Sequence, residues 1–181
     1  MKLNIGSGYT RIEGFLNVDK DPLCNPDIIA DLEDLHLPLE DSTVDHVVAF
    51  HVLEHIGTGY LGLMKELYRV CKHGAVFDIK VPHHRSEEFY GDPTHVRPVT
   101  AQQMKLFSKK YCENHIKQYG SSSGMALTLG VDFEIVEFFT PLYPKWQKRF
   151  ETMSEEDINE VIENYNNVFY ETQIRLMVIK E

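Results

Sequence analysis

Short apolar runs alternate with segments of helical periodicity through the first half of the chain. Five runs have the length of a strand, and they cover residues 3–5, 15–18, 27–30, 44–50 and 75–81. Between the last two, residues 60–71 repeat apolar side chains at spacings of three and four. That spacing predicts an amphipathic helix, which we expect to stop near Gly74. Strands that alternate with helices are typical of an α/β protein with a parallel sheet.

The second half of the chain begins with an aperiodic stretch, residues 82–98, that is rich in histidine, proline and charge. Loops longer than ~12–15 residues in compact domains are often functional. Thr100 and Gln103 form a capping-box pattern, so a helix is expected from 101 to about 110. Residues 132–140 and 170–178 predict two more strands, and Ser154 followed by three acidic residues predicts a helix over 154–167. Residues 113–130 fit either a short helix or a loop.

Length and composition narrow the class of protein. A chain of 181 residues with 43% hydrophobic residues has the size and core of one domain, residues 1–181. Its formal net charge of −10 disfavours nucleic acid as a partner. The apolar runs are too short to span a membrane, and no signal-peptide pattern precedes the first strand. Three cysteines without paired spacing indicate reduced thiols, so we expect a cytoplasmic protein.

The first strand ends in a glycine loop, Gly6-Ser7-Gly8, and the second ends in Asp19. In Rossmann-like folds an acid at that position accepts hydrogen bonds from a ribose diol, and the glycines let a ligand approach the backbone. The dinucleotide fingerprint needs a third glycine and an acid ~20 residues onward. Here Arg11 holds the third glycine's position, and too few residues remain before the second strand for a phosphate-binding helix. The spacing therefore favours a phosphate-free nucleoside over NAD.

Five short motifs occur in a fixed order, at residues 3–8, 14–19, 29–32, 51–56 and 67–74. In this order the chain resembles class I S-adenosylmethionine-dependent methyltransferases, most closely a small-molecule branch with a shortened first crossover. The resemblance covers roughly residues 3–110 and is looser over the last two strands. It implies a mostly parallel seven-stranded sheet whose antiparallel last strand is inserted beside the fifth. It also implies S-adenosylmethionine as cofactor.

The resemblance assigns roles residue by residue. Gly6, Ser7 and Gly8 would lie against the methionine part of the cofactor, and Asp19 would hold the ribose hydroxyls. Asp31 is placed to accept from the adenine amino group, Leu32 to pack on the base, and His51 to flank the methionine. The chain departs from the fuller family pattern at Thr10, where a third glycine often stands.

The histidine-rich loop, about 82–99, is expected on the substrate side, because ligands bind at the carboxyl ends of strands in open α/β sheets. Methyl transfer needs alignment and sometimes removal of a proton, which suits histidine. His95 is the first candidate for a catalytic base, with Asp92 to orient it, and His83 is the second. The acceptor is expected to be an oxygen or nitrogen of a small molecule or glycan.

Other interpretations of the histidines are weaker. The H-x-x-E-H pattern from His51 to His55 occurs in zinc peptidases, but Gly57 and Gly59 prevent the sustained helix that such a site needs. A metal bound by His83, His84 and His95 fits no standard spacing, so no metal site is expected.

Two questions of function stay open in the sequence. The alternative to an enzyme is a non-catalytic module that keeps the fold and the nucleoside ligand. A helical insertion at about 141–168 could cover the substrate site or form the face of a homodimer.

Overall fold

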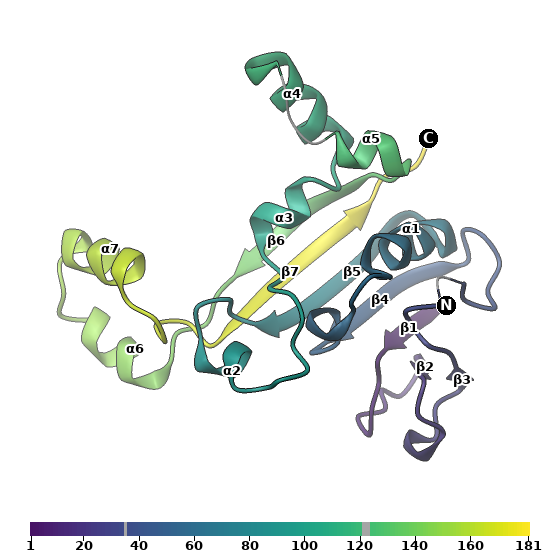
Figure 1. Cartoon of the computed structure of the whole chain (residues 1–181), viewed down its shortest axis with the longest axis horizontal. Coiled ribbons are helices and arrows are strands. Elements are labelled where there is room, and N and C mark those ends of the chain that lie inside the picture. Colours follow the sequence, from purple (N-terminus) through teal and green to yellow (C-terminus); the bar gives the residue numbers. More distant parts are fainter. Residues whose placement is uncertain (35, 121–123) are drawn as a thin grey trace.

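The computed structural model describes residues 1–34, 36–120 and 124–181, and a seven-stranded sheet runs through it (Figure 1). The strand order is β3-β2-β1-β4-β5-β7-β6. The strands are β1 (Lys2–Ile5), β2 (Leu16–Asp19), β3 (Ile28–Ile29), β4 (Val44–Phe50), β5 (Cys71–Pro82), β6 (Phe133–Phe139) and β7 (Glu171–Val178).

Helices and short helical turns connect these strands. The α-helices are α1 (Tyr60–Val70), α2 (Glu87–Tyr90), α3 (Ala101–Lys105), α4 (Lys109–Tyr119), α5 (Met125–Leu129), α6 (Pro144–Phe150) and α7 (Glu155–Asn164). Two 3-10 turns, η1 (Pro22–Cys24) and η2 (Leu53–His55), follow β2 and β4. None of the helices in the described ranges is long and apolar enough to cross a membrane.

The topology confirms the predicted fold class. Strands β1 to β5 pair in parallel, whereas β7 is antiparallel to both β5 and β6 and lies between them. The last strand is therefore inserted beside the fifth, as the resemblance implied. Parallel neighbours place the carboxyl ends of β1, β2 and β4 at one edge of the sheet, where Gly6, Asp19 and His51 follow their strands.

Several element boundaries differ from the sequence-based expectation. Helix α1 ends at Val70 rather than near Gly74, because Cys71 already pairs with Val44 as the first residue of β5. Gly74 lies inside β5 with φ +75°, next to an irregularity in the register. The capping box of Thr100 is present, but α3 is short, and a new helix, α4, begins after Ser108 caps it.

Residues 113–130, which the sequence left unassigned, contain the end of α4 and all of α5. Positions 121–123 of that stretch lie outside the described residues. The 141–168 segment is helical as expected, although it forms two helices, α6 and α7, around a small cluster of Trp146, Val161 and Val168.

The core lies on one face of the sheet. Alternate residues of β5, among them Phe77 and Ile79, are buried with α1 and with Phe107 and Phe133. The intervening residues on the other face are linked by ion pairs instead. Asp78 accepts from Arg175 Nε at 2.6 Å and lies 2.8 Å from His46 Nε2. Strong alternation of this kind fixes the register of the strands.

A buried polar network takes the place of the first crossover helix. Parallel strands are normally joined by a dozen or more residues, usually a helix, but only residues 6–15 join β1 to β2. Asn17, 2% exposed, accepts hydrogen bonds from Asn4 Nδ2 and the Ile12 N–H, both at 2.9 Å. Its own N–H and side chain donate to Asp27 Oδ2 at 2.8 and 2.9 Å. Bonds from Asn17 and Arg11 lower the pKa of Asp27 to about 2.

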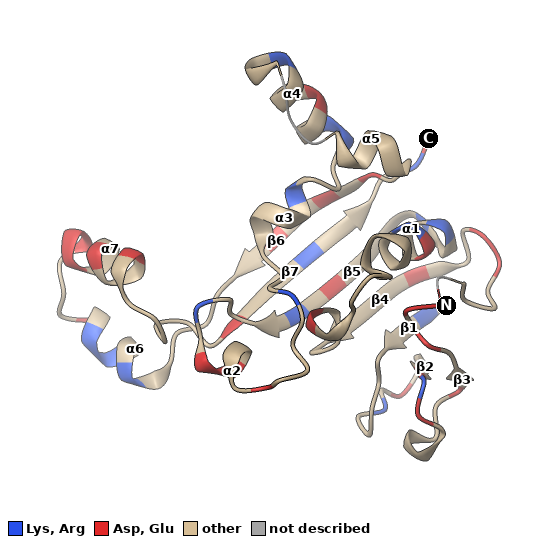
Figure 2. Ribbon diagram, in the orientation of Figure 1, with Lys and Arg blue, Asp and Glu red and all other residues tan. Residues whose placement is uncertain are grey.

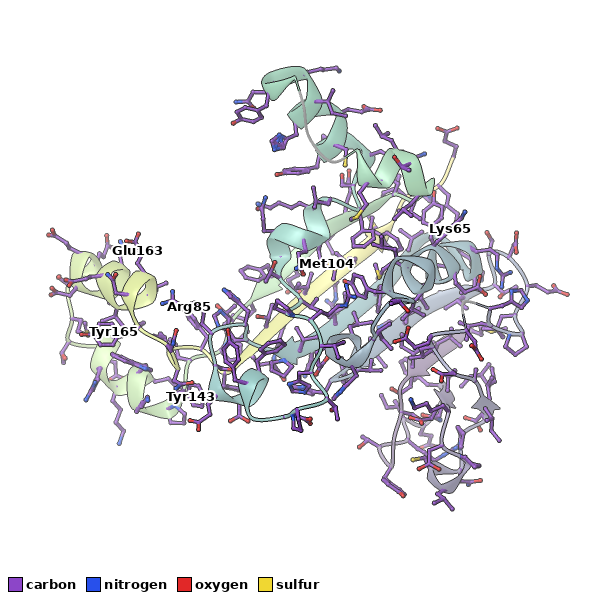
Figure 3. The ribbon with its side chains drawn as sticks, viewed as in Figure 1. Lys65, Arg85, Met104, Tyr143, Glu163 and Tyr165 are labelled. Atoms are coloured by element: carbon purple, nitrogen blue, oxygen red, sulfur yellow. The ribbon has the colours of Figure 1, made fainter. Side chains whose placement is uncertain are left out.

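The segment with α6 and α7 projects beyond the end of the sheet that carries α2 (Figure 1). Arg85 connects this segment to the histidine-rich loop and extends toward α7 in Figure 3. Its guanidinium donates to the backbone carbonyls of Ile162 and Glu163 at 2.9 and 3.0 Å. Tyr143, Lys145, Asn167 and Tyr170, from the two ends of this segment, line a cavity with His51 and Pro82, which follow β4 and end β5.

The two glycines after β1 provide a test of the local backbone. Both have positive φ, +60° at Gly6 and +48° at Gly8, but a Cβ at Gly6 would also lie 2.2 Å from Val52 Cγ2. Gly8→Ala should lower the free energy of unfolding by about 1–2 kcal/mol, the cost of a left-handed alanine. Gly6→Ala should lower the free energy of unfolding by about 1–3 kcal/mol more, because its Cβ clashes with Val52. Equal losses in urea titrations of the two variants would contradict the Val52 contact.

Candidate functional site

A cavity of about 450 Å³ opens at the carboxyl edge of β1 to β4, and we call it the glycine-loop cavity. Its volume is in the range of small-ligand sites. Of the residues predicted to bind cofactor, five line it: Gly6, Asp19, Asp31, Leu32 and His51. The structure therefore brings together side chains from four successive strands and loops. Ser7 and Gly8 are next to Gly6 in the chain but do not line the cavity.

Asp19 is held by the glycine loop. Its Oδ2 accepts from the Gly8 N–H at 2.7 Å, and Oδ1 accepts from the Asp21 N–H at 3.0 Å. A carboxylate has about four acceptor positions, so these two bonds leave others for a ligand hydroxyl. The hydroxyl of Ser7 is buried and has no hydrogen-bond partner among the described residues. A nucleoside with a polar tail fits such a set of free acceptors and donors.

The loop after β3 forms the opposite wall of the glycine-loop cavity. Leu32 is 6% exposed and presents an apolar surface, while Asp31 accepts from the Glu33 N–H at 3.0 Å. Glu33 binds the backbone N–H groups of Gly57 and Gly59, which ties this loop to the segment after β4. An apolar wall beside a carboxylate suits a purine base with an exocyclic amine.

A second, larger cavity of about 870 Å³ adjoins the first, and the two share His51 and His55. We call it the acidic cavity. Among the described residues that line it, Lys145 is basic and five are acidic, namely Glu54, Glu87, Glu88, Asp92 and Glu171. Figure 2 shows acidic residues gathered around α2 and the nearby end of β7. Such a lining attracts cations and repels phosphate groups.

His51 lies at the boundary between the two cavities, in the left-handed region with φ +55°. Its Nε2 is 2.9 Å from Glu171 Oε2, and its Nδ1 is 3.6 Å from Glu54 Oε1. Glu54, followed by Glu171, raises the pKa of His51 above its ordinary value, against the opposite effect of partial burial. Backbone conformations of this kind in a non-glycine residue cluster at functional sites.

The loop that carries His95 is fastened to η2. The backbone carbonyl of Glu54 accepts from the Val96 N–H at 2.9 Å, and Arg97 donates to the Ile56 carbonyl at 2.7 Å. His95 therefore lies in the acidic cavity, with its Nε2 3.8 Å from Asp92 Oδ2. The two residues predicted as a catalytic pair are brought together.

His83, the other predicted catalytic residue, lies elsewhere. It lines neither of these two cavities, and its Nδ1 accepts from the Arg85 N–H at 3.2 Å. Burial lowers the pKa of His83 to about 4. Its ring packs against His84 and Phe169, which indicates a role in holding the loop.

Sequence reasoning missed part of the acidic cavity. Glu171, Tyr170, Tyr143 and Asn167 come from the end of the chain, and only the insertion of β7 beside β5 brings them to His51. The Tyr143 hydroxyl donates to Glu88 Oε1 at 3.3 Å, and Figure 3 shows Tyr143 where α6 meets the sheet. Glu54 follows two apolar residues, Val52 and Leu53, and this could have indicated that it is buried. Charged side chains, however, usually lie at the surface.

Comparison with known proteins tests the predicted class. A family model described as a methyltransferase domain matches residues 9–79, somewhat less than half of the chain. No curated protein sequence matches.

Solved structures resemble nearly the whole chain. A SAM-dependent methyltransferase from Archaeoglobus fulgidus is 23% identical with a TM-score of 0.63, covering 97% of this chain and 85% of that one. A possible histamine N-methyltransferase from Thermotoga maritima is 14% identical, with a TM-score of 0.57 and coverage of 97% and 80%. Phosphoethanolamine N-methyltransferase 2 of Haemonchus contortus, in complex with S-adenosyl-L-methionine, is 14% identical, with a TM-score of 0.56 and coverage of 99% and 48%.

These findings confirm the predicted class. The chain has the fold of the class I S-adenosylmethionine-dependent methyltransferases, and its N-terminal half carries the methyltransferase-domain sequence. At the level of the fold and of the domain match over residues 9–79, the findings agree with the predicted enzyme class and its cofactor, S-adenosylmethionine.

The contacts of His51 predict a pH dependence. The pKa of His51 is higher in the folded protein than in the unfolded chain, so protonation of His51 stabilises the fold. This stability is fully present at pH values below the ordinary pKa of histidine. It is lost as the pH rises through the pKa of His51 in the folded protein. Glu171→Gln removes one of the two carboxylates, so the pKa of His51 in NMR titration should fall, and the loss of stability should begin at lower pH. Glu137→Gln, whose carboxylate pairs with Arg175 and lines neither of the two cavities, is the control. An unchanged His51 titration in Glu171→Gln would contradict this account.

Proposed function

We propose that the chain binds S-adenosylmethionine in the glycine-loop cavity and transfers its methyl group to a small molecule in the acidic cavity. One observation carries this proposal: the two cavities adjoin, and His51 and His55 line both. Methyl transfer requires donor and acceptor to be held in line at close range, and adjoining cavities supply that alignment.

In this proposal, each wall of the glycine-loop cavity holds one part of the donor. Asp19 accepts from the ribose hydroxyls, Asp31 from the adenine amino group, and Leu32 packs on the base. Gly6, Ser7 and Gly8 lie near the methionine part, with Gly6 in the wall of the cavity. The bound cofactor supplies a methyl group on a sulfonium centre.

The acceptor is proposed to be a neutral or cationic small molecule, or a glycan, that offers an oxygen or nitrogen. The carboxylates of Glu87, Glu88 and Glu171 favour ammonium and hydroxyl groups over phosphates. The pair His95 and Asp92 would accept the acceptor's proton, because both line the acidic cavity. His83 is the weaker of the predicted bases, since Nδ1 is already bonded and the ring lies outside the cavity lining.

Calorimetry tests the donor site. Asp19→Ala should weaken binding of S-adenosylhomocysteine by about 1–3 kcal/mol, the value of hydrogen bonds to a charged group. Asp19→Asn keeps an acceptor for the Gly8 N–H and should weaken the binding of S-adenosylhomocysteine less than Asp19→Ala does. Asp34→Ala is the matched control. The substitution removes the same charge, but Asp34 is exposed and does not line the cavity. Equal affinity in Asp19→Ala and Asp34→Ala would remove Asp19 from the ribose site.

Turnover tests the acceptor site. Formation of S-adenosylhomocysteine is measured over a panel of amines, polyols and sugars. With an accepted substrate, His95→Ala should lower kcat by about 10²–10⁴-fold, as expected for loss of a general base, and His83→Ala should lower it far less. Donor binding without turnover on any acceptor would favour the non-catalytic module instead.

A further inference from the structure

We propose that Glu54, His55 and His95 form a binding site for a divalent transition-metal ion on the wall of the acidic cavity. One carboxylate oxygen and one nitrogen from each imidazole all lie within 4.8 Å of one another. This set differs from the His83, His84 and His95 group that the sequence suggested, and it was hidden because Glu54 and His95 are far apart in the chain.

The Glu54 carboxylate is the first argument. The residue is 0% exposed, yet neither of its carboxylate oxygens has a hydrogen-bond partner among the described residues. The nearest charged group, His51 Nδ1, is 3.6 Å away, beyond hydrogen-bond distance. A buried carboxylate without a partner is strongly unfavourable, and a bound cation removes that cost.

The protonation of His95 is the second argument. Its Nδ1 lies 2.8 Å from the Phe89 carbonyl oxygen, which can only accept a hydrogen bond. Nδ1 therefore carries the proton, and in the neutral ring Nε2 keeps a free lone pair. Metal-binding histidines are oriented in this way, through the nitrogen that does not bind the metal.

His55 is oriented by the same principle. Its Nδ1 lies 2.9 Å from Thr94 Oγ1, and that hydroxyl is 2.6 Å from Asp92 Oδ1. Because Thr94 donates its one proton to the Asp92 carboxylate, its oxygen accepts from His55 Nδ1–H. The lone pair of the neutral ring is then on Nε2, so both imidazoles are set for coordination.

The three side chains are held on a firm backbone. Hydrogen bonds from Val96 and Arg97 to the Glu54 carbonyl fix the loop of His95 against η2. Zinc ligands at about 2.1 Å from the ion are separated by about 3.4 Å in a tetrahedron. Movement of about an ångström by the imidazole rings therefore completes the site.

Two histidines and one carboxylate are a set that binds Zn²⁺ and its neighbours and leaves positions open. Here the open positions face the acidic cavity, since all three residues line it. The bound ion would also activate the methyl acceptor. That role rests on the proposed methyl transfer, whereas metal binding itself does not. An acceptor hydroxyl bound there loses its proton to water more readily. Its oxygen then bonds to the methyl carbon while the sulfur–methyl bond breaks and leaves its electron pair on sulfur.

The experiment uses the full chain without a polyhistidine tag, stripped with chelator and then titrated with Zn²⁺ or Mn²⁺ in a calorimeter. One ion per chain is expected at about micromolar affinity or better. Glu54→Gln and His95→Ala should each abolish this binding. Thr94→Val should weaken it about 10–100-fold, as is typical of a residue that orients a ligand, and Thr94→Ser should restore it.

His36→Ala is the matched control, because it removes a histidine that is 76% exposed and far from the cluster. Wild-type binding no tighter than that of Glu54→Gln would overturn the proposal, as would binding that His36→Ala abolishes. Thermal unfolding gives a second readout. The metal-free Glu54→Gln variant should melt above metal-free wild type, because a buried carboxylate that accepts no hydrogen bond is gone. Metal should raise the melting temperature of wild type and of His36→Ala, but not that of Glu54→Gln.

Both measurements omit S-adenosylmethionine, so they can succeed or fail independently of the proposed methyl transfer. In turnover assays the two roles of His95 also separate. If His95 is only a base, chelator leaves the rate of the wild type unchanged. If His95 is a metal ligand, chelator lowers that rate as much as His95→Ala does.

Discussion

The hydrogen-bond network of Asn17 is the constraint on which the ligand-binding edge depends. It lets ten residues join two parallel strands that usually need a crossover helix. Asn17 bonds to Asn4 on one side and to Asp27 on the other, so the buried side chains of both asparagines have partners. The short connection still brings Asp19 back beside the glycine loop, where the Gly8 N–H binds its carboxylate at 2.7 Å. Asp19 and the glycine loop thus stay together without a crossover helix.

The second organising feature is the fastening of the histidine-rich loop to η2. Arg97 and Val96 bind the backbone of residues 54–57, and Arg97 also stacks 4.3 Å from the Tyr60 ring. A loop that carries function is thereby held on a rigid support. The same contacts bring Glu54, His55 and His95 together, so the acidic cavity and the proposed metal site share one scaffold. The buried Glu54 carboxylate is a destabilising element at this point, which is common where function competes with stability.

Both cavities open at the carboxyl edge of the sheet, and His51 lies between them with a carboxylate on either side of its ring. The chain therefore has two adjoining cavities, and the larger one is strongly acidic. That polarity follows from the second half of the chain, because Glu171 and α2 complete the acidic wall. One fold can host many functions through the sites that it carries.

The sequence by itself predicted an α/β fold with a parallel sheet and a nucleoside-binding glycine loop, from periodicity, the glycines after the first strand and the spacing of the following acid. The inserted antiparallel strand and the roles of the donor-side residues were implied by the resemblance to class I methyltransferases. Gly6, Asp19 and Asp31 could be found in this way because each is next to its strand in the chain. Only the tertiary structure decided where α1 ends, since pairing of Cys71 with Val44 overrides the glycine stop. It also decided that His83 lies outside the acidic cavity, and that Glu171 and Glu54 meet at His51. Those contacts join residues up to 120 positions apart, and no local pattern encodes them.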